Sequence, residues 1–350
     1  MNIKIFCAYL EYQDLLRISV ASAGNDHRLG ADEAPPAIIS IYLGEELEGI
    51  LTALESGKAY SAKKKTDLKI GVSVLPPIPK DSTDRNRTSP FAFTGNKFEF
   101  RMVGSSTNIS CPNFILNTIV AEQLRQFADE LEKAEDFNLS LSSLIKKVIK
   151  NHKRILFNGN NYSAEWEKEA ARRGLGNHKT TVDALSHYGD KKNVELFERH
   201  KVLSRGEINS RKEIILENYS NIIHIEALTL IDMARKRIVP AVIGYQAFLL
   251  KELRLKKQVD MDLDSKLEEG LIKRISQLSA EFSSHLDKLD EDVKRYDSTW
   301  GNLEKATFCK DVLLVGMEKI RNSADEMELL IGKEYISIPT YEDILYSVKY

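Results

Sequence analysis

Long hydrophobic runs, a surplus of charge of one sign and a cysteine framework are all missing from this sequence of 350 residues. No stretch approaches the roughly 18 consecutive apolar residues of a membrane-spanning helix, which excludes an ordinary membrane protein. Fifty basic and fifty-two acidic residues give a formal net charge of −2. Such a balance provides no electrostatic footprint for nucleic acid. We therefore expect neither a membrane nor a nucleic acid as a partner.

Cysteine is scarce: Cys7, Cys111 and Cys309 are far apart in the sequence and form no CxxC pair. This usage is typical of a reducing compartment. The first residues also lack the apolar stretch and cleavage site of a secretory signal. Together these absences favour a cytoplasmic protein. The sequence has no P-loop and no Rossmann glycine fingerprint, which argues against an unrelated nucleotide-binding protein built on those motifs.

The chain changes character near residue 150. Before that point Gly, Pro, Ser and Asn separate short apolar stretches. The segments Leu68–Leu75 and Lys97–Met102 predict strands, the second because charged and apolar residues alternate along it. The segment Ile115–Leu131 predicts a helix, with Ser110 or Asn113 as its N-terminal cap.

Beyond residue 150 the sequence is mostly helical. Residues 207–255 are helix-like, although Pro240 should kink or break the helix. Apolar residues recur every three or four positions from about 263 to 296, and again from 313 to 331, which indicates amphipathic helices. The members of the first stripe are Leu267, Leu271, Ile275, Leu278, Phe282, Leu286, Leu289, Val293 and Tyr296. Three long helices joined by short polar links predict an antiparallel bundle.

These patterns predict an α+β fold. Residues 1–150 should form an incomplete curved sheet with flanking helices, and residues 151–350 a bundle of long helices.

Two segments near the N-terminus combine residue types that bind anions. In residues 25–36, Arg28, Glu33 and their charged neighbours precede two prolines. From residue types alone, this segment is either a solvated turn or a ligand-binding loop. The second segment, residues 84–90, contains Arg87. Lys97, Glu99 and Arg101 follow it on the predicted strand. Arg and Lys bind phosphoryl and carboxylate oxygens, and Glu is a suitable Mg²⁺ ligand. The alternative for this strand is an exposed face held by ion pairs.

The strings GNDHRLGADEAPPAI, DRNRTSPFAF and GNKFEFRMVGSS resemble the type III branch of the glutamine synthetases. Their order also matches the wider family, in which an Arg then Glu-Ala-Pro loop precedes an Asn-Arg-Ser/Thr segment and a basic-x-Glu-x-Arg strand. The segment 161–185 (NYSAEWEKEAARRGLGNHKTTVDAL) is similar to the type III form as well. The chain thus resembles the second half of the catalytic domain followed by the C-terminal helical region of that branch.

The resemblance implies a role for each matching position. Arg28 and Arg101 correspond to arginines that bind the glutamate substrate. Glu33 corresponds to the flap glutamate that helps to deprotonate ammonium. Arg87 corresponds to a catalytic arginine near the nucleotide phosphates. Lys97 corresponds to a basic residue at the nucleotide end of the site, and Glu99 corresponds to a metal ligand.

The implied activity is glutamate–ammonia ligase, which consumes ATP with Mg²⁺ or Mn²⁺ and forms a γ-glutamyl phosphate. Its partners would be glutamate, ammonia and ATP, in a homo-oligomer. Most metal ligands of the family belong to a half that this chain does not match, and one glutamate cannot hold two or three Mg²⁺ ions. We therefore expect a truncated or split C-terminal part, inactive without that N-terminal half or neighbouring subunits. The alternative is a non-catalytic assembly or regulatory module derived from the family.

Overall fold

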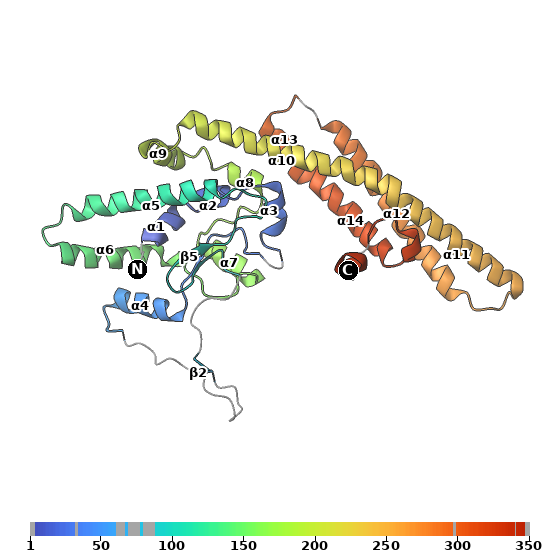
Figure 1. Cartoon of the computed structure of the whole chain (residues 1–350), viewed down its shortest axis with the longest axis horizontal. Helices are drawn as coiled ribbons and strands as arrows, with labels where there is room; N and C mark the ends of the chain where they lie inside the picture. The colour runs from blue at the N-terminus through green and yellow to red at the C-terminus, as the bar shows by residue number, and fades with distance from the viewer. Residues whose placement is uncertain are drawn as a thin grey trace. The chain divides into compact units, whose positions relative to one another are not determined.

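A computed structural model of the chain describes residues 4–31, 34–60, 67–68, 78–79, 88–296, 299–339 and 341–346. The chain divides into two compact units, Met1–Ile215 and Leu216–Tyr350. Helices dominate both units, and a small mixed sheet belongs to the first (Figure 1). The α+β class is therefore confirmed. The family-domain boundary near residue 150 stays a prediction.

The first unit surrounds a short three-stranded sheet with helices. Its strands are β1 (Ile41–Tyr42), β4 (Phe91–Phe93) and β5 (Phe98–Phe100), and β2 (Asp67–Leu68) pairs separately with β3 (Ile78–Pro79). Its helices are α1 (Lys4–Glu11), α2 (Gln13–Ile18), α3 (Ala23–Arg28), α4 (Glu45–Ser56), α5 (Ser110–Leu131), α6 (Phe137–His152), α7 (Ala164–Arg172), α8 (Thr181–Leu185), α9 (Lys191–Arg199) and the start of α10 (Arg205–Met233). A 3₁₀ turn, Lys153–Ile155, follows α6.

In the sheet, β4 lies between its two neighbours. It pairs parallel with β1 and antiparallel with β5, so that Ala92 lies opposite Glu99. The strand predicted over Lys97–Met102 is thus present, with its regular part shortened to Phe98–Phe100. The other predicted strand, Leu68–Leu75, lies mostly outside the described residues.

One face of the β4–β5 pair is aromatic. The Phe91 ring stacks on Phe98 with centroids 5.3 Å apart and meets the edge of Tyr9 from α1 at 4.4 Å. Every residue from Ile5 to Leu10 in α1 is buried, as expected for a helix enclosed on all sides. The sheet therefore rests its phenylalanine face on α1 and presents the alternate side chains on the other face.

Helix α5 begins at Ser110, but neither predicted cap holds its first turn. Ile109 occupies the cap position and makes no side-chain bond. Instead Asn108 Oδ1 accepts a hydrogen bond from the Ser110 amide at 2.7 Å. The cap prediction was wrong because an Asx bond from two residues upstream satisfies the free amide equally well.

The second unit is a helical bundle. It contains the rest of α10, a π-helical turn (Ala234–Ile238), α11 (Val239–Val259), α12 (Lys266–Arg295), α13 (Asn302–Phe308), a second π-helical turn (Cys309–Leu313), α14 (Leu314–Glu328), a 3₁₀ turn (Lys333–Tyr335) and α15 (Tyr341–Tyr346). Helix α12 packs against both α11 and α14. None of the described helices combines the length and apolar character needed to cross a bilayer.

The stripe predicted for α12 is buried from Ile275 to Val293. Its first member, Leu267, is 73% exposed because it lies in the first turn, at the end of the packed region. Burial of the stripe supplies most of the stability of such helices, since propensity alone contributes little.

Pro240 neither ends nor sharply breaks the helix that contains it. Residues 205–259 are continuously helical, with a π-helical turn over Ala234–Ile238 that ends two residues before the proline. A proline removes one hydrogen bond and crowds the carbonyl four residues earlier. Widening the preceding turn relieves that crowding, so the interruption falls one turn earlier than the sequence predicts.

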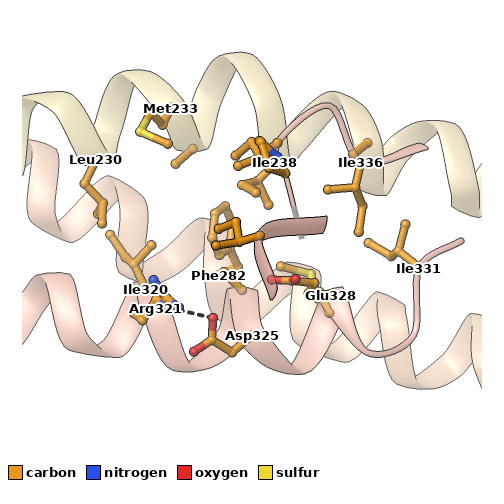
Figure 2. A pocket seen from close by; sticks show the side chains of 17 residues that line it. Leu230, Met233, Ile238, Phe282, Ile320, Arg321, Asp325, Glu328, Ile331 and Ile336 are labelled. Carbon is orange, nitrogen blue, oxygen red and sulfur yellow. Dashed lines mark hydrogen bonds and ion pairs between the residues drawn. The ribbon is translucent and has the colours of Figure 1, made fainter. Parts of the chain in front are cut away.

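Beside this π-helical turn the bundle encloses an apolar pocket of about 270 Å³. Figure 2 shows Leu230, Phe282 and Ile320 on its walls and the Arg321–Asp325 ion pair at its edge. Ile336 and Ile344, from the C-terminal segment, also line it. Packing between the long helices is thus incomplete at this point.

Candidate functional site

Arg28 lies at the C-terminal end of α3, although the sequence favoured a loop there. Ser22 caps this short helix, its hydroxyl accepting from the Asn25 amide at 3.2 Å. The backbone becomes extended at Leu29 and turns at Gly30, where φ is +80°. A glycine suits that left-handed conformation. The helix end therefore fixes where the Arg28 side chain starts.

The Arg28 guanidinium joins α3 to the end of β5. Its Nη2 donates to the Met102 carbonyl at 2.7 Å, although the two residues are 74 positions apart. Its Nε donates to the Asn25 side-chain oxygen at 2.9 Å. Burial lowers the pKa of Arg28, which nevertheless remains a cation because arginine keeps its proton in proteins. The structure thus holds the positive charge of Arg28 against the backbone of Met102, the residue that follows Arg101.

Lys97, Glu99 and Arg101 share the face of β5 opposite the phenylalanines. Glu99 forms ion pairs with Lys97 at 3.4 Å and with Arg101 at 3.2 Å. The exposed fractions of these side chains are 67% for Lys97, 39% for Glu99 and 20% for Arg101. Hydrogen bonds first from Arg101 and then from Lys97 lower the pKa of Glu99. This face of the strand therefore carries an accessible carboxylate between two cationic side chains.

Ala92 of β4 is the cross-strand neighbour of this carboxylate. It lies directly across from Glu99 in the β4–β5 register and is buried. This position adjoins the carboxylate, so an arginine there would add a third cation beside Glu99. In this chain the β5 face relies on Lys97 and Arg101.

Two predicted site residues, Glu33 and Arg87, lie outside the described residues. Arg28, Lys97, Glu99 and Arg101 lie within them, and hydrogen bonds or ion pairs connect them to β5 or its end. The roles that the resemblance gives to all six stay predictions.

The part of the chain that the structure describes does not form a magnesium site around Glu99. Mg²⁺ requires near-octahedral coordination by oxygen. Over these residues, one group of three side chains could hold a metal ion, and it consists of Asp14, His187 and Asp190 rather than Glu99. Asp14 already lies 3.1 Å from the His178 ring and 2.8 Å from Lys192 Nζ. Within these residues Glu99 belongs to no such group.

Comparison with known proteins finds relatives of one family. The family model described as "Glutamine synthetase C-terminal domain" matches residues 140–257. The chain is 41% identical to a protein named glutamine synthetase from Butyrivibrio fibrisolvens, over 99% of the chain and 49% of that protein. It is also 38% identical to the type-3 glutamine synthetase of Dictyostelium discoideum, over 96% of the chain and 46% of that protein.

The chain belongs to the glutamine synthetase family. A further glutamine synthetase, from Bacteroides fragilis (strain YCH46), is 36% identical over 96% of the chain and 48% of its own length. The chain spans about half the length of the curated relatives it matches. It therefore represents a C-terminal part of a glutamine synthetase.

Sequence reasoning missed Asn25, which the structure places at the centre of the Arg28 contacts. Its Nδ2 donates to the Val20 carbonyl at 2.8 Å and to the Met102 carbonyl at 2.9 Å. The available signal was its position three residues before Arg28, one helical turn away, inside a string typical of glutamine synthetases. Its partners on the strand side could not be read from the sequence.

Proposed function

We propose that the chain forms one wall of a glutamate–ammonia ligase site, in which ATP and glutamate give a γ-glutamyl phosphate that ammonia converts to glutamine. The observation that carries this proposal is the Arg28–Met102 hydrogen bond of 2.7 Å. It brings the Arg28 segment against the strand of Lys97, Glu99 and Arg101. Membership of the glutamine synthetase family supports glutamate, ammonia and ATP as the substrates of this cluster.

In this proposal Arg28 and Arg101 bind glutamate. A guanidinium can hold a carboxylate through two parallel hydrogen bonds, which fixes both its position and its orientation. Arg28 already uses Nε and Nη2 in the protein. Its Nη1, which forms no hydrogen bond within the described ranges, remains for the substrate.

The phosphoryl end of the site would use Arg87, Lys97 and Glu99. Lys97 is the most exposed of the three charged residues on the β5 face and can approach nucleotide phosphates. Arg87 would stabilise negative charge during phosphoryl transfer. Glu99 would give one oxygen ligand to Mg²⁺ or Mn²⁺, completed by ligands from the N-terminal half or a neighbouring subunit of a homo-oligomer.

The reaction balances without a further reactant. An oxygen of the glutamate side-chain carboxylate attacks the γ-phosphorus of ATP, and ADP leaves with the bond electrons. Ammonia nitrogen then attacks the acyl carbon, and inorganic phosphate leaves. Glu33 would accept the proton that ammonium loses before this attack. Fixed arginine charges lower the barrier because they are already oriented when negative charge develops. The scarcity of cysteine favours the cytoplasm as the place of this reaction.

The test joins the chain to the N-terminal half of the Butyrivibrio fibrisolvens relative, with which it is 41% identical. Glutamine formation from ATP, glutamate and ammonium is measured for the chimera and for the 350-residue chain alone. We expect turnover from the chimera that depends on all three substrates. A folded, assembled chimera without turnover would overturn the proposal.

The second candidate is a non-catalytic assembly or regulatory module. The observation that favours it is the apolar surface of the helical unit: Ile222, Ile225, Ile243 and Leu250 are exposed, and the pocket of Figure 2 is apolar. Such surfaces often contact partners. If the chain alone changes the assembly of a complete glutamine synthetase while the chimera has no activity, this second function is favoured.

A further inference from the structure

Asn25 has an unusual environment for a polar residue outside the predicted site. It is 2% exposed, and its side chain reaches from α3 to the backbone just after β5. A buried amide is costly unless its hydrogen-bonding groups are satisfied.

The Asn25 amide uses both of its N–H groups and its oxygen. The nitrogen donates to the carbonyls of Val20 and Met102, and Oδ1 accepts from Arg28 Nε at 2.9 Å. Because Arg28 Nη2 donates to the same Met102 carbonyl, the amide, the guanidinium and the strand end form a closed ring of hydrogen bonds. Such a ring fixes the plane of the guanidinium.

Gly104 leaves room for this amide on the strand side. A Cβ atom at Gly104 would lie 3.2 Å from Asn25 Oδ1 and 3.4 Å from Thr107 Oγ1. Contacts of this length force the amide to shift by a few tenths of an ångström. The chain that follows Met102 is thus shaped around the Asn25 oxygen that accepts from Arg28.

We propose that Asn25 is the positioning residue for Arg28: it fixes the guanidinium so that Nη1 faces the glutamate carboxylate. This inference rests on the proposed function for the identity of the substrate. Asn25 does not touch glutamate. It acts by removing the rotational freedom of Arg28, which lowers the entropy lost when the substrate binds.

A double-mutant cycle in the chimera tests the proposal. Asn25→Ala should raise the KM for glutamate by roughly tenfold, the size expected for losing a hydrogen bond to a charged group. The KM for ATP should not change. In an Arg28→Ala background the same substitution should cause no further rise, because Asn25 acts only through Arg28. Independent, multiplicative effects of the two substitutions would overturn the positioning role.

Asn193→Ala is the matched control. Asn193 is also a buried asparagine of the first unit, and its Nδ2 donates to the His187 carbonyl at 2.8 Å. We expect this variant to leave the glutamate KM unchanged. If Asn25→Ala does not fold, Gly104→Ala provides the milder test: it should raise the glutamate KM alone and have no effect when Arg28 is alanine.

A second readout does not depend on activity. In the 350-residue chain labelled with ¹⁵N-arginine, the Arg28 Nε–H resonance should be protected from exchange, and Asn25→Ala should abolish this protection while Asn193→Ala preserves it. An unprotected Arg28 resonance overturns the ring of hydrogen bonds. If the Arg28 resonance is protected but Arg28→Ala leaves the glutamate KM of the chimera unchanged, the substrate role of Arg28 in the proposed function is overturned.

Discussion

Glu99 and Glu122 each interact with several cationic side chains, yet their exposure gives them different tasks. Glu99 is partly open to solvent on a strand face. Glu122 is buried in α5, where it pairs with Arg125 at 2.8 Å, Arg199 at 2.7 Å and His200 at 2.8 Å. A buried carboxylate with this many donors links helices, whereas an exposed one remains available to a ligand.

Substitution of Glu99 should separate chemistry from stability. In the chimera, Glu99→Ala should abolish glutamine formation, because it removes a proposed metal ligand without opening a cavity in the core. Circular dichroism and thermal unfolding should match the parent protein. Glu130→Ala, which removes another partly exposed carboxylate that pairs with a lysine, is the control and should retain activity. Retained activity in Glu99→Ala would contradict the ligand role.

Glu122 should make the stability of the first unit dependent on pH. Hydrogen bonds, first from Arg125, lower the pKa of Glu122 from 4.5 to about 2. A carboxyl group with a depressed folded pKa stabilises the protein fully above its unfolded pKa. That contribution is lost as the pH falls from about 4.5 to about 2. Urea unfolding at a series of pH values should show this loss.

Glu122→Gln provides the decisive comparison. At pH 7 it should cost several kcal/mol, because it leaves cationic partners of a buried carboxylate uncompensated. The difference from the parent protein should shrink as the pH falls below about 4.5, where Glu122 of the unfolded parent chain begins to be protonated, and should be lost near pH 2. Glu130→Gln, in an exposed pair with Lys147, should change stability little. A pH-independent difference would exclude the assigned coupling.

At the scale of helices and strands, local patterns predicted elements better than their ends. Alternation placed Glu99 and the phenylalanines on opposite faces of one strand, because a pleated strand leaves no other choice. The buried stripe from Ile275 to Val293 was predictable because the helical period places residues three or four positions apart on one face. The cap of α5 and the π-helical turn before Pro240 were not, since several neighbouring residues could satisfy the same backbone groups.

The candidate site shows the same division between local and tertiary information. Arg28, Glu99 and Arg101 were found from motifs. The role of Asn25 was not, because it depends on the Met102 carbonyl, 77 positions away. A one-dimensional pattern specifies which side chains share a face of one element, but not which distant backbone group will meet them.

The buried stripe of α12 can be tested with a matched pair of substitutions. Leu278→Asp places a charge in the seam with its packing partners, at a cost of several kcal/mol. Leu267→Asp makes the same chemical change on the same helix at an exposed position. We expect the first to lower the melting temperature or disrupt assembly, and the second to do neither, as measured by circular dichroism and size-exclusion chromatography. Equal effects would show that the stripe is not a buried seam.

For the whole molecule, the coverage of the relatives bears on what the isolated chain can do. Its β5 face has Lys97 and Arg101 on either side of Glu99, and among the described residues Glu99 is the carboxylate of that face. The matched relatives are about twice as long as the part that aligns. In the proposed function, the substrate-binding arginines and most of the metal ligands would therefore lie in different halves of the enzyme, and neither half would suffice alone.

The isolated 350-residue chain should consequently form no glutamine and bind Mn²⁺ only weakly. A divalent cation needs several oxygen ligands, and with one carboxylate flanked by Lys97 and Arg101 the dissociation constant should exceed about 1 mM. Electron paramagnetic resonance of free Mn²⁺ measures this directly. Joining the N-terminal half should tighten binding, and Glu99→Ala should reverse part of that gain. Tight Mn²⁺ binding by the isolated chain that survives Glu99→Ala would locate the metal elsewhere, with Asp14, His187 and Asp190 as the first group to substitute.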